Sequence, residues 1–268
     1  MSRRRKFGSV HSLFENFGVN SHTSAFIVPR NAREESIVDI QAISSVEALF
    51  SKWREAQRKE PDEVFRSYSP SGAVPKESFL PDGIIDLAEY AGAKTKILFI
   101  AKEAHWFQPQ NGNDALKPAD GLFWVQNVVK ERLSSGRGGT NFSRRLALLA
   151  GRALSEPKPY RALQKAAFLN LNKRGGFRGC VWRTLEGYVG QYHHFIRREM
   201  ELIAPDCIVC CGSGVKWLLD QYGCVPTGTR VVAVYHPSYF ALSDEAYLWQ
   251  LDCAMGRETF GGSQKIPS

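Results

Sequence analysis

The chain has 268 residues and a mass of 30.1 kDa, enough for one large α/β domain or two small ones. A hydrophobic content of 43% and an aromatic content of 12% exclude a disordered chain. No apolar run approaches the roughly 20 residues of a membrane span, and the basic start MSRRRKF precedes no apolar segment. We therefore expect a cytoplasmic protein that does not bind membranes and whose six cysteines are reduced thiols.

Positive charge is concentrated in one part of the chain. The whole chain carries a net charge of +8, with 35 lysines and arginines against 27 aspartates and glutamates. Residues 130–183 alone contain 13 lysines and arginines but two acidic residues, so their net charge is +11. Such a tract suits a phosphate backbone or another polyanion, and a solvated basic surface is the alternative.

The N-terminal part of the chain predicts an extension followed by a first helix. Residues 1–40 are rich in arginine near the start and show no sustained period, so we expect a basic, flexible extension before a domain at 41–268. Ser44 and Glu47 have the spacing of a capping box and predict a helix that stops before Pro61. A loop over 67–83 and a short helix over 84–92 follow.

Four short apolar runs then alternate with amphipathic segments. The runs, each typical of a strand buried on both faces, are 96–101, 166–171, 206–211 and 230–235. The predicted helices are 141–154, 184–203, 214–222 and a last one near 244–258. This order predicts a three-layer α/β/α sandwich with a central, mostly parallel sheet of about four strands.

Polar residues follow the carboxyl ends of these strands, where open parallel sheets bind their ligands. Glu103 follows the first run, and Asn170 lies at the end of the second. Gly212 and Ser213 follow the third run, and His236 follows the last. A carboxylate, an amide, a Gly/Ser turn and an imidazole are therefore expected at one edge of the sheet, beside a basic loop.

These segments resemble the uracil-DNA glycosylase superfamily over about residues 96–240. The HPSY segment at 236–239 is similar to its second signature, and ILFIAKEAHW occupies the place of the first, whose best-known form is GQDPY. AFLNLNKRGG looks like the strand that ends in Asn with a Lys three residues later. GLFWV is similar to the GLCFSV segment, and CGSG to the Gly-Ser turn that grips a DNA phosphate. The resemblance implies a DNA partner and the α/β sandwich expected above.

The resemblance also implies the chemistry of the two catalytic residues. Glu103 takes the position of the catalytic aspartate, where a carboxylate beneath the sugar stabilises the oxocarbenium-like centre and can orient a water. His236 would stabilise the negative charge that develops on the departing base. The expected activity is that of a monofunctional DNA glycosylase, which leaves a free base and an abasic site.

Other residues would bind the extruded base and the DNA strand. Asn170 would read the edge of the base, with Asn172 as the alternative, and a bulky residue after HPS would fill the gap left in the duplex. The residues implied to bind the base are Asn170, Asn172, Phe123, Trp124 and His105. Those implied to bind DNA are Lys102, Lys173, Arg174, Gly212, Ser213, Pro237, Ser238, Tyr239 and Phe240.

Three departures from the family pattern concern the base pocket. Glu103 replaces an aspartate, and its extra methylene moves the carboxylate by about an ångström. Ala104 and His105 replace the proline and tyrosine of the first signature, and the loop from Glu103 to Trp124 is longer than in the uracil-specific form. We therefore expect a larger or modified pyrimidine as the substrate, such as glucosylated hydroxymethylcytosine of phage DNA. DNA repair and phage defence both remain open.

Two alternatives to a DNA glycosylase were considered. A catalytically inactive module of the same fold would recognise modified or damaged DNA without cleaving it. A hydrolase of free nucleosides is disfavoured by the basic tract and by the aromatic wedge. We expect a monomer with no metal or organic cofactor, and we interpret Cys207 and Cys210 as buried thiols rather than cluster ligands.

Overall fold

The computed structural model describes residues 39–69, 74–105, 124–136, 139–176 and 179–257, except for the side chains of His105 and Trp124. The chain divides into two units, residues 1–37 and 38–268, and every described residue belongs to the second. The extension expected over 1–40 therefore lies almost entirely outside the described residues.

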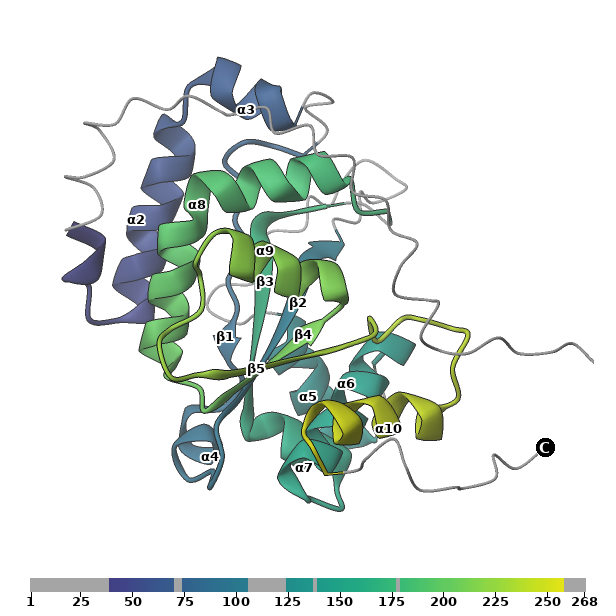
Figure 1. Cartoon of the computed structure of the whole chain (residues 1–268). Coiled ribbons are helices and arrows are strands. Elements are labelled where there is room, and N and C mark those ends of the chain that lie inside the picture. The colour runs from purple at the N-terminus through teal and green to yellow at the C-terminus, as the bar shows by residue number, and fades with distance from the viewer. Residues whose placement is uncertain (1–38, 70–73, 106–123, 137–138, 177–178, 258–268) are drawn as a thin grey trace, which may run out of the picture. The chain divides into compact units, whose positions relative to one another are not determined.

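A five-stranded sheet in the order β1-β3-β2-β4-β5 forms the centre of the second unit (Figure 1). The strands are β1 Gly83–Ile84, β2 Ile97–His105, β3 Ala166–Gly176, β4 Cys207–Cys211 and β5 Arg230–Val234. The last four are parallel neighbours, whereas the two-residue β1 pairs with β3 in the antiparallel direction. The predicted α/β class is confirmed, and β1 makes the sheet mixed.

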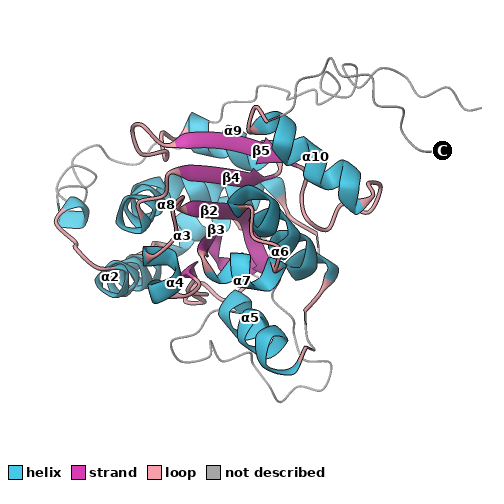
Figure 2. Ribbon diagram, turned by 90° about the horizontal axis from the view of Figure 1, so that it is seen from below, coloured by secondary structure: helices cyan, strands magenta, loops and turns pink. Residues whose placement is uncertain are grey.

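Helices cover both faces of this sheet, as the view from below shows (Figure 2). One face packs against α2 Val46–Lys59, α3 Asp62–Tyr68, α4 Leu87–Ala91, α8 Trp182–Ile203 and α9 Ser213–Gln221. The other packs against α5 Trp124–Ser135, α6 Asn141–Leu154, α7 Pro159–Gln164 and α10 Asp244–Ala254. We name these two hydrophobic cores the α8 core and the α6 core after their central helices.

The continuous apolar runs are explained by these two cores. Successive side chains of a strand point to opposite faces, so Leu98 and Ile100 enter the α8 core while Ile97 and Phe99 enter the α6 core. All four are fully buried. Strands β3 and β4 are buried throughout, so polar residues within them need partners inside the protein.

The helix predictions differ from the structure mainly at short elements. The first helix begins at Val46 because Ser45, not Ser44, is its cap and accepts a hydrogen bond from the backbone N–H of Ala48 at 3.2 Å. The helix predicted over 141–154 has those bounds, but α3, α5 and α7 were not predicted. Those three helices have 7, 12 and 6 residues, and the shortest begins at a proline.

Strands β2 and β3 continue past the predicted strand ends, to His105 and Gly176. Glu103 pairs with Asn172, and the next pair joins His105 to Gly176, so the longer segment of β3 forms a bulge. Gly175 lies in this bulge with φ of +82°, and a side chain there would meet Leu80 at 2.8 Å. The bulge redirects the strand end around Glu103.

The connections make the boundary between β2 and β4 the switch point of the sheet. The chain leaves β2 through helices of the α6 core and enters β3, whereas it leaves β4 through α9 of the α8 core and enters β5. Adjacent strands whose connections run to opposite faces form the switch point at which open α/β sheets bind ligands. Glu103 lies on one of these strands, and the turn at Gly212 follows the other.

Candidate active site

The carboxyl group of Glu103 is held by three neighbours at the carboxyl end of β2. Asn172 donates from Nδ2 to Oε2 of Glu103 at 3.0 Å, and the Cys180 thiol also donates to the carboxylate. The Asn172 amide is itself fixed, because Nδ2 also donates to the carbonyl of Gly175 and Oδ1 accepts from the N–H of Arg174. The bulge in β3 therefore supplies groups that hold the Glu103 side chain, and we call this arrangement the seat of Glu103.

Burial raises the pKa of Glu103 to about 6, against the opposing effects of the hydrogen bonds from Asn172 and Cys180 and of the nearby Lys102 charge. Glu103 as a residue is half-buried. Burial, together with the Glu103 charge, raises the pKa of the Cys180 thiol to about 12, so Cys180 acts as a hydrogen-bond donor and not as a thiolate. A carboxyl with a pKa near neutrality suits acid–base work or charge stabilisation.

Gly176 forms the third side of this seat, and sequence reasoning did not identify it. A methyl group on its Cα would overlap both oxygens and the carboxyl carbon of Glu103. The second glycine of the RGG segment is therefore required by a close approach of side chain to backbone, and not by an unusual φ. No sequence signal distinguishes this requirement from an ordinary turn glycine.

We expect Gly176→Ala to destabilise the protein by about 1–3 kcal/mol, because the added methyl group must displace the Glu103 carboxyl from its hydrogen bonds. Urea unfolding measures this change. Gly179→Ala is the matched control, since a methyl group there meets no atom within 4 Å. Adding Glu103→Ala to Gly176→Ala should restore most of the loss, and an unchanged stability of Gly176→Ala would contradict the close contact.

His236 follows β5 in a turn that α10 holds in place. The backbone N–H of Tyr235 donates to Oε1 of Gln250 at 3.0 Å, and the Tyr247 hydroxyl donates to the Tyr235 carbonyl at 2.6 Å. Nδ1 of His236 accepts from the backbone N–H of Ser238 at 3.2 Å. Because Nδ1 is the acceptor, the neutral ring carries its hydrogen on Nε2, which can donate to a substrate oxygen.

Arg145 organises the loop that carries His236, and the sequence did not reveal this role. Its guanidinium donates to the carbonyls of Pro237, Tyr239 and Leu242, with 2.7 Å to Leu242, and to the carboxylate of Asp244 at 3.1 Å. Arg145, a buried residue of α6, therefore holds the backbone of the HPSYF segment in place. This anchoring leaves Tyr239 40% and Phe240 92% exposed beyond the turn.

Glu103 and His236 lie toward the same face of the sheet. Glu103 continues the alternation of Ile97, Phe99 and Ala101, which all enter the α6 core. The Phe142 ring of α6 lies 6.1 Å from that of Phe168 on β3 and 5.2 Å from that of His236. Only β4 separates β2 from β5, so the two strands are roughly 10 Å apart.

Asn170 and Asn172 differ in how their side chains are used. Asn170 pairs with Ala101 of β2, and its backbone N–H donates to Asp82 at 2.7 Å. The Asn172 amide binds Glu103, Gly175 and the N–H of Arg174, so it is better described as positioning Glu103 than as reading a base. Asn170 is 3% exposed and lies within β3, not past its end, so its role in reading a base stays a prediction.

The prediction that Lys173 and Arg174 bind DNA is wrong. Lys173 is fully buried and forms ion pairs with Asp82 and Glu199. Arg174 is 2% exposed and pairs with Glu60 at 2.7 Å. Both side chains are held by buried carboxylates, so these cations serve the interior and cannot reach a phosphate.

Five cations of the basic tract pair with acidic residues from other parts of the sequence. Arg144 and Arg145 both pair with Asp244, and Arg152 pairs with Asp252 at 2.6 Å. A phosphate-binding role is therefore excluded for the buried Lys173 and Arg174, whereas the side chains of Arg144 and Arg152 stay 45% and 51% exposed.

The other predicted DNA-binding residues lie at or near the same edge of the sheet. Gly212 has φ of +130° and precedes α9, and Ser213 is exposed at the first position of that helix. Lys102 is half-buried, Ser238 is exposed, and Pro237 is buried with its carbonyl on Arg145. Phe123 and the side chains of His105 and Trp124 lie outside the described part of the chain, so their predicted roles stay predictions.

The cysteines are consistent with the interpretation as thiols. All six lie within the described residues and are free, and Cys207 and Cys210 are both buried. Cys207 enters the α6 core and Cys210 the α8 core, so the C-x-x-C spacing places the two thiols on opposite faces of the sheet.

Among the described helices, none is both long and apolar enough to cross a membrane.

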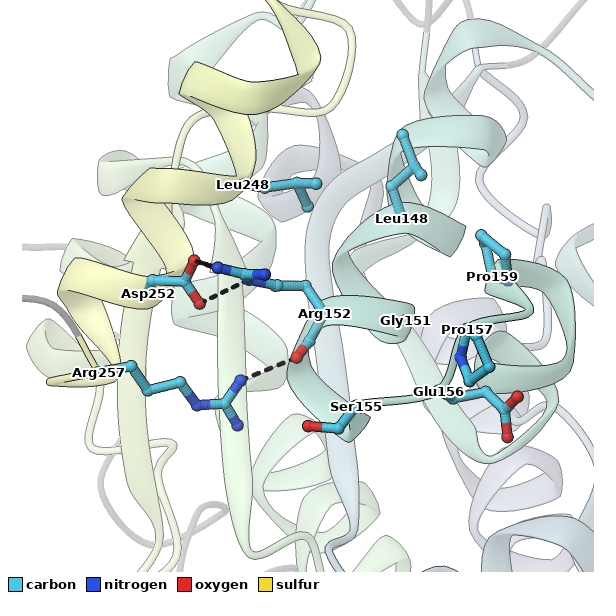
Figure 3. A pocket seen from close by; sticks show the side chains of 10 residues that line it. All are labelled: Leu148, Gly151, Arg152, Ser155, Glu156, Pro157, Pro159, Leu248, Asp252 and Arg257. Carbon is cyan, nitrogen blue, oxygen red and sulfur yellow. Dashed lines mark hydrogen bonds and ion pairs between the residues drawn. The ribbon is translucent and has the colours of Figure 1, made fainter. Parts of the chain in front are cut away.

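A hollow of about 570 Å³ lies away from this site, between the C-terminal end of α6, the loop before α7, and α10 (Figure 3). Its charges are matched within its walls: Arg152 bonds to Asp252, and Arg257 donates to the carbonyl of Arg152 at 2.8 Å. Phe142, which contacts His236, lies at the other end of α6, roughly 15 Å along the helix axis from Arg152. This hollow is therefore separate from the Glu103 edge.

Comparisons with known proteins add no family assignment. No protein-family model matches the chain, and no curated protein is significantly similar to it. The chemistry of the described residues therefore carries the functional argument.

Proposed function

We propose that the protein is a DNA glycosylase that hydrolyses the N-glycosidic bond of an extruded base. The observation that carries this proposal is the seat of Glu103, where Asn172, Cys180 and Gly176 hold a half-buried carboxyl at the switch point of the sheet. An imidazole whose Nε2 can donate a hydrogen bond follows β5, toward the same face. Two such groups match the opposite charges that develop when a base leaves deoxyribose.

The proposed reaction assigns one charge to each residue. As the bond from C1′ to the base nitrogen breaks, its electron pair leaves with the base and positive charge develops on the sugar. The Glu103 carboxylate stabilises this charge and orients a water, whose oxygen bonds to C1′. Nε2–H of His236 donates a hydrogen bond to the base oxygen and stabilises the departing anion. The one proton that the water releases on bonding to C1′ neutralises the departing base anion, which gives the free base.

The surroundings of these residues support an extruded base in DNA as the substrate. Tyr239 and Phe240 project from a loop that Arg145 fixes, as a wedge that replaces an extruded nucleotide must. Asn170 lies on β3 beside Ala101 of β2 and is proposed to read the base. Because Ala104 and His105 stand where a proline and a tyrosine shape the uracil pocket of the family it resembles, we propose a larger modified pyrimidine as the base.

The test is a set of duplex and single-stranded oligonucleotides that carry uracil, hypoxanthine, a mismatched thymine or glucosylated hydroxymethylcytosine. Alkali converts each abasic product into a strand break, which gel electrophoresis detects. We expect breaks with at least one modified pyrimidine. His236→Ala should slow the reaction by roughly 10²- to 10³-fold, because it removes a preorganised hydrogen-bond donor.

Two results would count against this proposal. If DNA binds tightly but no substrate is cleaved, the inactive DNA-binding module is the better description. If His193→Ala, in the middle of α8, slows excision as much as His236→Ala, the histidine after β5 has no special role. Thermal unfolding of both variants separates loss of activity from loss of folding.

A further inference from the structure

Two tryptophans form an exposed aromatic pair beside the candidate active site. Trp182 is the first residue of α8 and Trp217 lies on α9, and their ring centroids are 5.9 Å apart at an angle of 46°. Their exposed fractions are 38% and 37%, so each ring keeps accessible surface. Neither tryptophan belongs to the α8 core or the α6 core.

The pair covers the place where two helices begin. A methyl group on Gly214, in the first turn of α9, would come within 2.8 Å of the Trp182 ring, so this ring lies directly on the start of α9. Neither α8 nor α9 has an acidic residue in its first turn, and within the described residues neither has a side-chain cap. Two positive helix ends and Arg183 therefore border the rings, without a carboxylate in either first turn.

Chain connectivity places this surface next to Glu103. Cys180 donates to the Glu103 carboxylate, and Trp182 follows two residues later, within about 7 Å of extended chain. Gly212 and Ser213, which lead into α9, come from the switch-point strand β4. A strand of nucleic acid with one nucleotide at Glu103 would therefore pass over the two rings.

We propose that Trp182 and Trp217 form a stacking platform for unpaired bases of the DNA strand that carries the target nucleotide. This inference rests on the proposed function, because it assigns how the same site holds the strand around its target. Flat aromatic rings bind the faces of bases, and the uncapped helix starts attract the phosphates between them. A purely apolar protein partner would gain nothing from the two positive helix ends.

The test measures binding of a short fluorescein-labelled oligothymidylate to the full-length protein by fluorescence anisotropy over a range of salt concentrations. We expect Trp182→Leu and Trp217→Leu each to raise Kd by roughly 5- to 150-fold, since leucine keeps apolar contact but removes the flat ring. Trp182→Phe should retain most of the affinity. The slope of log Kd against log salt should stay unchanged, because no ion pair to phosphate is lost.

Trp249→Leu is the matched control. Trp249 is 39% exposed on α10, in the helix layer on the other face of the sheet, and its replacement should leave Kd unchanged. Thermal unfolding of each variant shows whether the fold is intact. Gly214→Ala is a second route to the same result, because the added methyl group moves the Trp182 ring without removing it.

The outcomes separate this inference from the proposed function. If both leucine variants bind the oligonucleotide as Trp249→Leu does, the platform is wrong even when the protein excises bases. If they lower affinity while no base is ever excised, the platform stands and the glycosylase proposal fails. If they change the molecular mass in solution and leave oligonucleotide affinity unchanged, the rings form a contact between copies of the chain and the platform is again wrong.

Discussion

Replacing Glu103 by glutamine is expected to abolish most base excision and, at neutral pH, to make the protein harder to unfold. The loss of rate should be roughly 10²- to 10⁴-fold, because a neutral amide cannot stabilise a positive sugar or orient a water as a base. The gain in stability follows from burial, which raises the pKa of Glu103 to about 6. A residue retained despite a cost in stability is typical of a functional site.

The stability difference between wild type and Glu103→Gln should depend on pH with a defined sign. The folded protein binds the Glu103 proton more tightly than the unfolded chain, whose glutamate has a pKa near 4.5. Wild-type stability contributed by this group is therefore complete below pH 4.5 and falls as the pH rises through 6. Above pH 6 the cost levels off at up to about 2 kcal/mol, which glutamine avoids.

Urea unfolding of both proteins between pH 4.5 and 7.5 measures this difference. Glu55→Gln is the control, because Glu55 lies on the exposed side of α2 and its hydrogen bond and ion pair with Lys59 lower its pKa. That variant should change stability little and with the opposite dependence on pH. A Glu103→Gln protein that is less stable than wild type at pH 7.5 would mean that the carboxylate is well solvated in the folded state.

The same pKa predicts the pH profile of the reaction. If the carboxylate is the active form, kcat/KM should rise about tenfold per pH unit below pH 6 and level off above it. A rate that instead falls above pH 6 would assign Glu103 the role of proton donor. Because the hydrogen bond from Asn172 lowers the Glu103 pKa, Asn172→Ala should move this limb to higher pH with the fold intact, and an unmoved limb would contradict the positioning of the carboxyl by Asn172.

The strands and the two catalytic candidates could be predicted from the sequence because their signals are local. A short run such as KILFIA has both faces buried, which requires a sheet covered on two sides. The polar residue that follows such a run then belongs to the ligand-binding edge, and this rule located Glu103 and His236. Neither inference depends on which distant residues come into contact.

Pairings between distant residues could not be predicted in this way. Thirteen cations within 54 residues suggested a basic surface, yet Arg144 and Arg145 pair with Asp244, about 100 residues later. The seat of Glu103 was likewise hidden, since only the bulge in β3 brings Gly176 against the carboxyl. Charge counts along a chain describe neighbours in sequence, whereas burial and ion pairing are set by neighbours in space.

Lys173 is a cation that the charge count placed on the surface and that the fold buries, so its replacement should have a large effect on stability. We expect Lys173→Met to destabilise the protein by about 3–5 kcal/mol, because it leaves two buried carboxylates without their shared cation. Burial already raises the pKa of Glu199 well above its ordinary value, and the Lys173 charge is what opposes this shift. Methionine keeps contact with the rings of Phe50 and Trp53, over which the ammonium lies. The loss therefore reports charge, not packing.

Chemical denaturation of two further variants separates the contributions. Lys165→Met removes a partly exposed partner of Glu156 and should cost less than about 1 kcal/mol. Combining Lys173→Met with Asp82→Asn and Glu199→Gln removes all three charges and should recover most of the stability, since a neutral cluster needs no cation. Asparagine at position 82 still accepts the hydrogen bond from the N–H of Asn170. If Lys173→Met instead unfolds like wild type and lowers the salt dependence of DNA binding by about one unit, Lys173 reaches a phosphate and its burial is refuted.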